Sequence, residues 1–365
     1  MLKPIRRINC SDALVACRGL QEALANWLCE PTTSANDITN ANLTLRVATQ
    51  TEANWLWAFL QKIDKEKSLL SRAQTVAAMS GANKKLLRDW IDAISTLTDQ
   101  FQANPPVWPA VRPAIPLPSW QAFKELMEAF YEKGLRSGLP YLANGTPVAT
   151  GGVTYMQFVQ EFRNAHRLNS NTDAREVCVF CGGPLDDIEV DHWLAKSEYP
   201  LFSVSPDNLA PICGRCNSSG NKGTKPVHDQ GRFTDWYHPY LRHPKGSVRL
   251  DYDLQTSSIK FSTIDPGDTP KALNLNKLLN LTERWTREFK AEYVTHQRTL
   301  IERERRRVNR GQPRHSQNDI ADYLQTEQDD LLVTEPYYEI HHVLFTATLE
   351  PSRLAAWHAE LELVL

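Results

Sequence analysis

Apolar residues recur at helical spacing through the first hundred residues of the chain. The stretches RGLQEALANWLCE, TEANWLWAFLQKI and KKLLRDWIDAISTL each place their apolar residues on one side of a helix. They also contain four tryptophans, which we expect to anchor a helical core rather than to stack on bases, because a tryptophan buries a large area wherever it points inward: Trp27, Trp55, Trp57 and Trp90. The pattern predicts a helical N-terminal domain over residues 1–102.

A proline-rich stretch over residues 103–118 interrupts the helical pattern. It carries six prolines, a density that excludes a helix and favours an extended, stiff connector. A ligand for a proline-reading domain is the alternative. The helical pattern resumes over residues 119–174, in WQAFKELMEAFYEKGL and YMQFVQEFRNAHRL. The connector therefore leads from one helical region to another.

The last region, residues 233–365, mixes both periodicities. VRLDYDLQ and SIKFSTI alternate with period two around a polar turn, which predicts a β-hairpin. From about Leu281 to Asn309 the helical period returns and predicts one long helix. YYEIHHVLFTATL is a candidate short strand, in which His341 and His342 would face opposite sides and so would not share a ligand. The expected fold class is α+β and mainly α.

Composition limits how this chain could meet a nucleic acid. Its 365 residues suggest two or three domains, and its formal charge of −2 is not that of a polycation. Nucleic-acid binding would need a local basic patch. The best candidate lies between Arg298 and Arg314, with seven arginines and two glutamates; an ordinary solvated helix end explains it equally well. The candidate phosphate contacts in this stretch are Arg305, Arg306 and Arg307.

The cysteines and the absence of long apolar runs suggest a cytoplasmic location. No stretch resembles a signal peptide or has about 18 consecutive apolar residues, so we expect no membrane span. Four of the seven cysteines form two tight pairs, a pattern typical of a metal site in a reducing compartment rather than of disulfides. Cys10, Cys17 and Cys29 are expected to be buried as small apolar residues.

The two Cys-x-x-Cys pairs lie in the central stretch CVFCGGPLDDIEVDHWLAKSEYPLFSVSPDNLAPICGRCNSSGNKGTK. Cys178 and Cys181 form one pair, and Cys213 and Cys216 form the other. Two such pairs make a closed tetrahedral site that suits structural zinc. An iron–sulfur cluster is the rival for four thiolates. A spacer of 31 residues separates the pairs, long enough to carry a structure of its own.

The spacer predicts the order strand, loop, strand, helix. IEVDHW is a short strand that ends at Asp191-His192, and LAPIC is a second strand that leads into the second cysteine pair. A helix is expected after Cys216, with Asn217 and Asn221 four residues apart on one face.

This stretch resembles the HNH endonuclease family, the ββα-metal or His-Me finger nucleases, in the variant stapled by four cysteines. The matching features are the two cysteine pairs, Asp191-His192, Asn208 in DNLAPIC and Asn217 in CNSSGNKG, over about residues 176–226. Asparagine stands at the last motif position instead of histidine, and the segment before Lys222-Gly223 is longer than usual. The resemblance implies a nuclease module over residues 175–232.

The resemblance also implies roles for single residues. His192 would be the general base, and Asp191 and Asn217 would hold a catalytic Mg²⁺ or Mn²⁺. Asn208 would hold the loop and orient His192 through backbone hydrogen bonds. Around the site, Lys222 and Lys225 are further candidate phosphate contacts.

The chemistry of these residue types agrees with phosphodiester hydrolysis. A neutral imidazole can take a proton from water near pH 7, and carboxylate and amide oxygens suit a hard divalent ion. Adjacent strand residues point to opposite faces, so Asp191 and His192 can serve one phosphate only if the strand ends or bends there.

We therefore expect a metal-dependent HNH endonuclease acting on DNA, with RNA as an alternative substrate. One rival is a nuclease subunit active only within a larger bacterial defence, restriction or RNA-guided complex, which would supply targeting as a protein or ribonucleoprotein partner. The other is a non-catalytic zinc module that binds DNA or protein.

Overall fold

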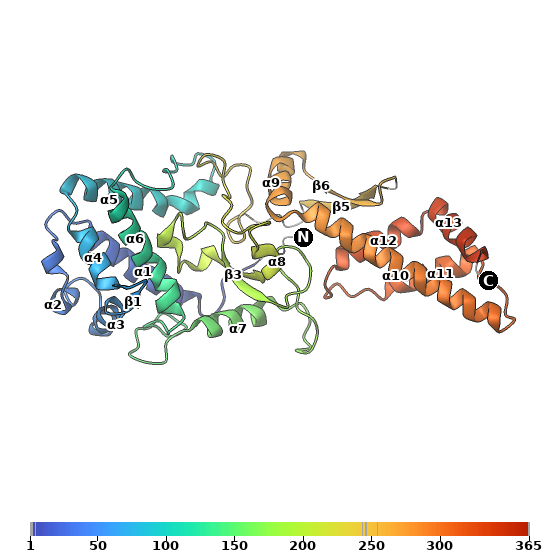
Figure 1. Cartoon of the computed structure of the whole chain (residues 1–365), viewed down its shortest axis with the longest axis horizontal. Helices are drawn as coiled ribbons and strands as arrows, with labels where there is room; N and C mark the ends of the chain where they lie inside the picture. The colour runs from blue at the N-terminus through green and yellow to red at the C-terminus, as the bar shows by residue number, and fades with distance from the viewer. Residues whose placement is uncertain (1–2, 4, 243, 245–246, 254, 364–365) are drawn as a thin grey trace. The chain divides into compact units, whose positions relative to one another are not determined.

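The computed structural model describes residues 3, 5–242, 244, 247–253 and 255–363. By contacts between its residues the chain divides into two compact units. The N-terminal unit comprises Pro4–His166 and Ile188–His243, and the C-terminal unit comprises Met1–Lys3, Arg167–Asp187 and Pro244–Leu365. Figure 1 shows their helices and strands. The five segments expected from the sequence stay predictions.

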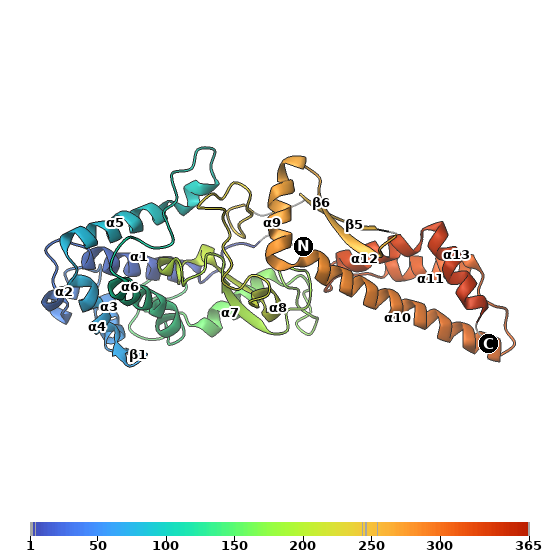
Figure 2. The same ribbon diagram turned by 45° about the horizontal axis from the view of Figure 1, so that its top comes forward.

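Helices dominate the N-terminal unit, as the apolar periodicity predicted. Figures 1 and 2 show α1, α4, α5 and α6 gathered together, and α4 packs on α6 and α1. Thr49, Ser68 and Ser80 each cap a helix by accepting a hydrogen bond from a first-turn amide. The helices are α1 Ser11–Leu28, α2 Asn40–Leu43, α3 Gln50–Leu60, α4 Leu69–Ala77, α5 Gly81–Ser95, α6 Leu117–Ala129 and α7 Tyr155–His166, with 3₁₀ turns at Ala35–Asp37 and Thr96–Phe101 and a short hairpin of β1 Ile63–Asp64 and β2 Lys67–Ser68.

Several sequence expectations for this unit are confirmed. Cys10, Cys17 and Cys29 are buried, as small apolar residues would be. Within the proline-rich stretch, Trp108 is buried and donates its Nε1–H to the hydroxyl of Tyr199 over 3.0 Å. This part of the connector therefore lies against the fold.

The end of α6 changes its winding. After Ala129 the chain continues as a π-helical segment over Phe130–Leu135, and Gly138 follows with a φ of 107°. Such wide turns occur mostly as single turns inside helices and often at functional sites. Here the segment carries Tyr131 and Glu132, which line the pocket described below.

The central module has the predicted order of strand, loop, strand and helix. Strand β3, Ile188–His192, pairs antiparallel with β4, Leu209–Cys213, and places His192 opposite Leu209. The connecting loop contains 3₁₀ turns at Pro200–Phe202 and Pro206–Asn208. Helix α8 covers only Gly214–Asn217.

The expected position of the helix after Cys216 is wrong. The helix begins before Cys216 and ends at Asn217, because Ser218 takes an extended conformation. Asn221 therefore does not lie one turn beyond Asn217 on a shared face. Its Nδ2 instead donates to the carbonyl of Arg215 over 2.7 Å and to Oγ of Ser218 over 3.2 Å, so it closes the loop behind the helix.

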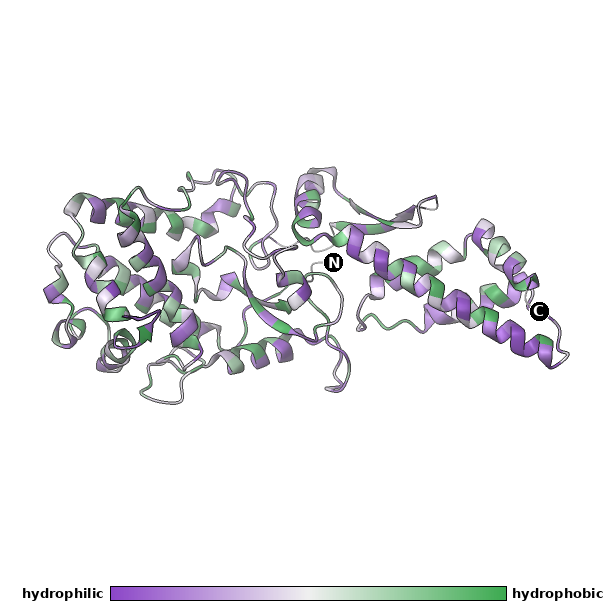
Figure 3. Cartoon of the chain, in the orientation of Figure 1, coloured by the Kyte–Doolittle hydropathy of each residue, from purple (hydrophilic) through white to green (hydrophobic). Residues whose placement is uncertain are grey.

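The C-terminal unit contains the predicted hairpin and the predicted long helix. Its elements are β5 Val248–Asp253, β6 Ser258–Thr263, a 3₁₀ turn at Pro266–Asp268, α9 Thr269–Leu279, α10 Leu281–Asn309, α11 Gln317–Asp329, α12 Tyr338–Thr348 and α13 Pro351–Glu362. Green apolar positions recur along a largely purple α10 in Figure 3. The core includes Leu300, Ile320, Leu324, Phe345 and Trp357.

The strand expected at YYEIHHVLFTATL is a helix, α12. Its buried residues Ile340, Leu344 and Thr348 recur every four positions, which a helix places on one side. Helix α12 packs against α10 and α11. Short apolar runs fit both periodicities, so tertiary packing made the choice here. Within the described residues, no helix is long and apolar enough to cross a membrane.

Candidate active site in the central module

His192 is held by one of its two ring nitrogens. It is the last residue of β3 and is buried, and its Nε2 lies 3.0 Å from the carbonyl oxygen of Ser203. A carbonyl only accepts hydrogen bonds, so Nε2 must carry the proton. In a neutral ring the proton-accepting nitrogen is then Nδ1.

The environment keeps the His192 ring neutral. The pKa of His192 is lowered to about 3, mainly by burial and also by the charges of Lys196 and Lys222, while the hydrogen bond to Ser203 acts in the opposite direction. The ring of Tyr131 meets the imidazole edge-on, with 4.6 Å between ring centroids. The imidazole therefore has a fixed orientation and a fixed tautomer.

Helices of the N-terminal unit hold the Ser203 carbonyl in place. The Ser203 hydroxyl donates to the carbonyl of Met127 in α6 over 2.8 Å. Gln21 in α1 donates its Nε2–H to the Ser203 hydroxyl over 3.0 Å and to the Met127 carbonyl over 2.9 Å. All three residues are buried. No sequence motif marks this support, because its members are far apart in the chain.

Asp191 has one carboxylate oxygen in an ion pair and one without a hydrogen-bond partner. The residue is buried, with 3% of its surface exposed. Oδ1 lies 3.5 Å from Nζ of Lys222, and Oδ2 is buried with no hydrogen-bond partner. Burial raises the pKa of Asp191, and the Lys222 ammonium opposes that rise. A buried carboxylate oxygen with nothing bound to it suits a cation that approaches from the pocket.

Lys222, which the sequence suggested as a phosphate contact, is buried in the structure, and that role stays a prediction. None of its surface is exposed. Its Nζ donates to the carbonyls of His192 over 3.1 Å and Gly223 over 3.0 Å, besides pairing with Asp191. The ammonium therefore ties the end of β3 to the loop after α8. A phosphate could reach it only after that loop opened.

Asn217 presents its amide oxygen because its amide nitrogen is already used. Nδ2 donates to a carboxylate oxygen of Glu189 over 2.6 Å. The carboxylate is an acceptor, so the nitrogen must face Glu189 and Oδ1 remains for a cation. Glu189 stands two positions before Asp191 on β3 and so shares its face of the strand. The sequence motif assigned no role to Glu189.

Asn208 holds the loop between β3 and β4 through hydrogen bonds. Its Oδ1 accepts from the amide of Leu194 over 2.7 Å, and its Nδ2 donates to the carbonyls of Leu194 over 2.9 Å and Phe202 over 3.1 Å. Its own carbonyl accepts from the amide of Trp193 over 2.9 Å. These contacts brace both sides of the loop that carries Ser203, and the expected role of Asn208 in orienting His192 stays a prediction.

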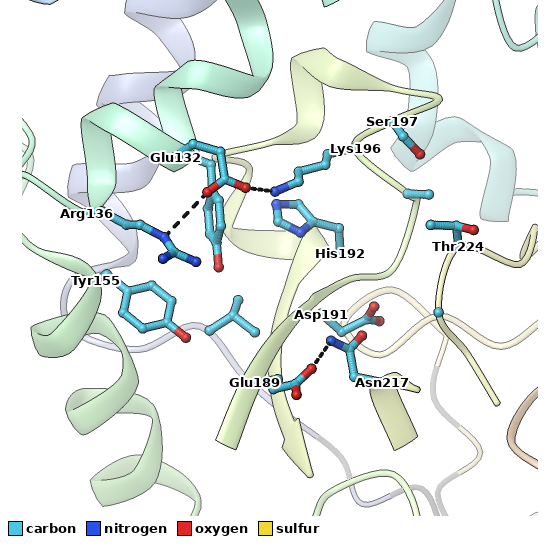
Figure 4. A pocket seen from close by; sticks show the side chains of 14 residues that line it. Glu132, Arg136, Tyr155, Glu189, Asp191, His192, Lys196, Ser197, Asn217 and Thr224 are labelled. Carbon is cyan, nitrogen blue, oxygen red and sulfur yellow. Dashed lines mark hydrogen bonds and ion pairs between the residues drawn. The ribbon is translucent and has the colours of Figure 1, made fainter. Parts of the chain in front are cut away.

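A pocket of about 410 Å³ is lined by Glu189, Asp191, His192 and Asn217. Strand β3 ends at His192, so Asp191 and His192 both line this pocket despite being neighbours in sequence. Figure 4 shows His192 near Lys196 and Glu132, and Asp191 near Asn217 and Glu189. Four lining residues not expected from the sequence come from the preceding helical segments: Tyr131, Glu132, Arg136 and Tyr155. No local motif marks them.

The four paired cysteines form a group that could hold a structural zinc. Their Sγ atoms all lie within 4.8 Å of one another, and all four residues are buried. In the first pair, Gly182 adopts a φ of 71° and Gly183 donates its amide to the Sγ of Cys181 over 3.4 Å. A positive φ is a conformation that glycine takes at little cost. An N–H that points at sulfur favours the thiolate form that a metal needs.

The remaining predicted phosphate contacts are surface residues. Lys225 donates its Nζ to the carbonyl of Gly220 over 2.6 Å. In the C-terminal unit, Arg305 pairs with Glu302, and Arg307 donates its Nε–H to the carbonyl of Pro313 over 2.8 Å. Arg305 and Arg306 are exposed. Their role as phosphate contacts stays a prediction.

Two curated proteins are similar to parts of this chain. The Septu protein PtuB of Bacillus thuringiensis is 35% identical over 106 residues, which make up 28% of this chain and 37% of PtuB. Protein ea31 of Escherichia phage lambda is 28% identical over 180 residues, or 43% of this chain and 60% of ea31. The chain thus spans less than two thirds of either relative. No family model matches it, and no solved structure matches it significantly.

Proposed function

We propose that the chain is a metal-dependent endonuclease of the HNH type that hydrolyses phosphodiester bonds in DNA. The observation that carries the proposal is the hydrogen bond from His192 Nε2 to the Ser203 carbonyl, which leaves Nδ1 as the proton acceptor of a neutral ring. A general base must be unprotonated at working pH and held within reach of its proton donor. His192 lines a pocket and meets the first requirement.

The residues opposite His192 suit a divalent metal ion. The unpartnered Oδ2 of Asp191 and the available Oδ1 of Asn217 are hard oxygen donors on one pocket, with Glu189 as a further carboxylate beside them. When bound there, Mg²⁺ or Mn²⁺ would stabilise the negative charge that develops on the phosphate and on the leaving oxygen. His192 would accept the proton of the attacking water at Nδ1.

The four cysteines support the same proposal by holding the framework. Cys213 ends β4 and Cys216 lies in α8. Zinc bound to the thiolates would therefore fix β4 and would also fix α8, the helix that carries Asn217. All four ligands come from the protein, which leaves no open position and makes a structural role fit better than a catalytic one.

A second candidate function is a nuclease subunit that acts only within a larger bacterial defence complex. The local similarity to the Septu protein PtuB favours it. The net charge of −2 also fits a protein whose targeting comes from a partner. In this case the chemistry at His192 is the same, and a partner protein would bind the target DNA and bring it to the pocket.

A plasmid-cleavage assay on the purified chain tests the proposal. Supercoiled plasmid is incubated with Mg²⁺ or Mn²⁺ and, as a control, with EDTA, using the native chain and His192→Ala. Divalent-dependent nicking by the native chain that is absent in the variant supports the nuclease. Cleavage only in the presence of a co-purifying partner supports the subunit. Equal cleavage by both proteins rejects His192 as the base.

A further inference from the structure

The pocket beside His192 has a cationic wall, one half of which comes from outside the resemblance to HNH nucleases. Its lining contains two cationic side chains among the described residues, Arg136 and Lys196. Arg136 follows the π-helical segment after α6 and precedes the first residue of the module, residue 175, by 39 positions. Lys196 lies in the loop after β3, and its charge lowers the pKa of His192, so it acts at close range on the imidazole.

Both cations share one carboxylate. Glu132 forms an ion pair with Nζ of Lys196, and its other oxygen lies 3.5 Å from Nε of Arg136. Figure 4 shows Glu132 between the two cations on the side of the pocket where His192 lies. A carboxylate shared by two cations occupies the place that a phosphate oxygen could take, because both anions accept the same hydrogen bonds.

Aromatic rings keep the two cations in position. The guanidinium of Arg136 lies 5.4 Å from the ring centroid of Tyr155 and 5.9 Å from that of Tyr131. Nζ of Lys196 lies 4.6 Å from the ring centroid of Tyr131. These contacts do not depend on Glu132, so the cations can keep their places when the carboxylate moves away. The Glu132 side chain is 39% exposed and has room to turn outward.

We propose that Arg136 and Lys196 form a binding subsite for a backbone phosphate of DNA, which Glu132 occupies as an internal anion until the nucleic acid enters. The subsite rests on the proposed function, because it places the phosphate beside His192. The pocket is then divided by charge, with Asp191, Asn217 and Glu189 on the metal-binding side and Arg136 and Lys196 on the phosphate-binding side.

The test measures DNA binding without cleavage. Full-length chain carrying His192→Ala is titrated against a short fluorescein-labelled DNA duplex in EDTA, at several salt concentrations, and anisotropy gives the affinity. Arg136→Gln, Lys196→Gln and Glu132→Gln are added one at a time. Lys85→Gln and Asp89→Asn are matched controls, since these two residues form an exposed ion pair of the same unit that does not line the pocket. Thermal midpoints establish that each variant is folded.

Opposite charge changes should have opposite results. Arg136→Gln and Lys196→Gln should each weaken binding and lower the salt slope by about 1, as expected for one lost phosphate contact. Glu132→Gln should tighten binding several-fold, whereas the control variants should leave it unchanged. If the two cation variants bind as the parent does, or if Glu132→Gln weakens binding, the ion pairs are only structural and the subsite is rejected.

The result separates the subsite from the proposed function. If the Arg136, Lys196 and Glu132 variants bind DNA as tightly as the His192→Ala parent, the subsite is rejected. Plasmid cleavage by the native chain can still support the proposed function. A parent that does not bind the duplex at all also rejects the subsite. Loss of plasmid cleavage in His192→Ala is scored separately and reports on the general base alone.

Discussion

The end of β3 and the turn after Phe233 each bury a histidine, and the two histidines are used differently. Burial lowers the pKa of both His192 and His238 to about 3. At His192 the ring donates from Nε2 to Ser203. At His238 the Nδ1 atom accepts from the amides of Tyr240 and Leu241, each over 3.2 Å.

This difference teaches that a lowered pKa does not by itself identify a catalytic histidine. In His238 the proton-accepting nitrogen is already filled by the turn, so the ring packs the turn and has no acceptor left for chemistry. In His192 the filled nitrogen is the donor. The hydrogen-bond pattern, and not the burial, separates a candidate base from a structural histidine.

The largest expected effect is the loss of cleavage at His192. His192→Ala should lower the cleavage rate roughly 100-fold to 10,000-fold, the usual contribution of a general base. His238→Asn is the matched control, because an amide oxygen can accept the same two backbone hydrogen bonds, and it should keep most of the activity. Plasmid nicking with Mg²⁺ measures both. Equal losses in the two variants would remove the distinction between the two histidines.

The second effect concerns the metal that would hold the ends of β4 and α8. Cys213→Ser should weaken zinc binding at least about 100-fold. Removing a residue that only hydrogen-bonds to a metal ligand already lowers metal affinity about 10-fold to 100-fold, and Cys213 would be a ligand itself. The thermal midpoint should fall with the zinc affinity. Elemental analysis and thermal unfolding measure the two quantities. Cys17→Ser, in a buried cysteine outside the group, should leave zinc content unchanged. A Cys213→Ser protein with full zinc would rule out the four-thiolate site.

The third effect isolates the buried cation under β3. Lys222→Met removes the only ion-pair partner found for Asp191 among the described residues and should cost about 3 kcal/mol of folding free energy, as an uncompensated buried charge does. The cost should shrink at acidic pH because Asp191 then binds a proton. Lys225→Met, in the same loop, should cost far less. Urea unfolding measures the stability of the two variants. Equal midpoints would mean that the buried ion pair contributes nothing to the folding free energy.

The smallest effect is the pH dependence of stability that His238 contributes. The unfolded chain binds a proton near pH 6.5, but the folded ring does not until about pH 3. Folding stability should therefore be complete above pH 6.5 and should fall as the pH drops below that value. His238→Asn cannot bind the proton at this position and should make the urea midpoint fall less steeply between pH 7 and pH 5. An unchanged slope would mean that His238 is not excluded from protonation.

Local pattern was enough to predict most elements. Apolar periodicity predicted the N-terminal helices, the hairpin and the long helix Leu281–Asn309, and the module motif predicted both of its strands. The apolar periodicity gave a wrong prediction at α12, where a short apolar run fits a strand and a helix equally well. It failed again after α8, where Ser218 leaves the helical conformation and Asn221 closes a loop instead.

For the candidate site, the sequence by itself determined the chemical groups. Asp191, His192, Asn208 and Asn217 could be named because their order and spacing lie within one short stretch, and the spacing of the four cysteines marked a metal-binding group. Only the tertiary structure decided how each group is held and what faces it. Ser203 fixes the tautomer of His192, Lys222 is buried against Asp191, and Arg136 and Glu132 complete the pocket. The physical reason is range: spacing along the chain encodes local geometry, whereas burial, ion pairing and pKa depend on residues that only folding brings together.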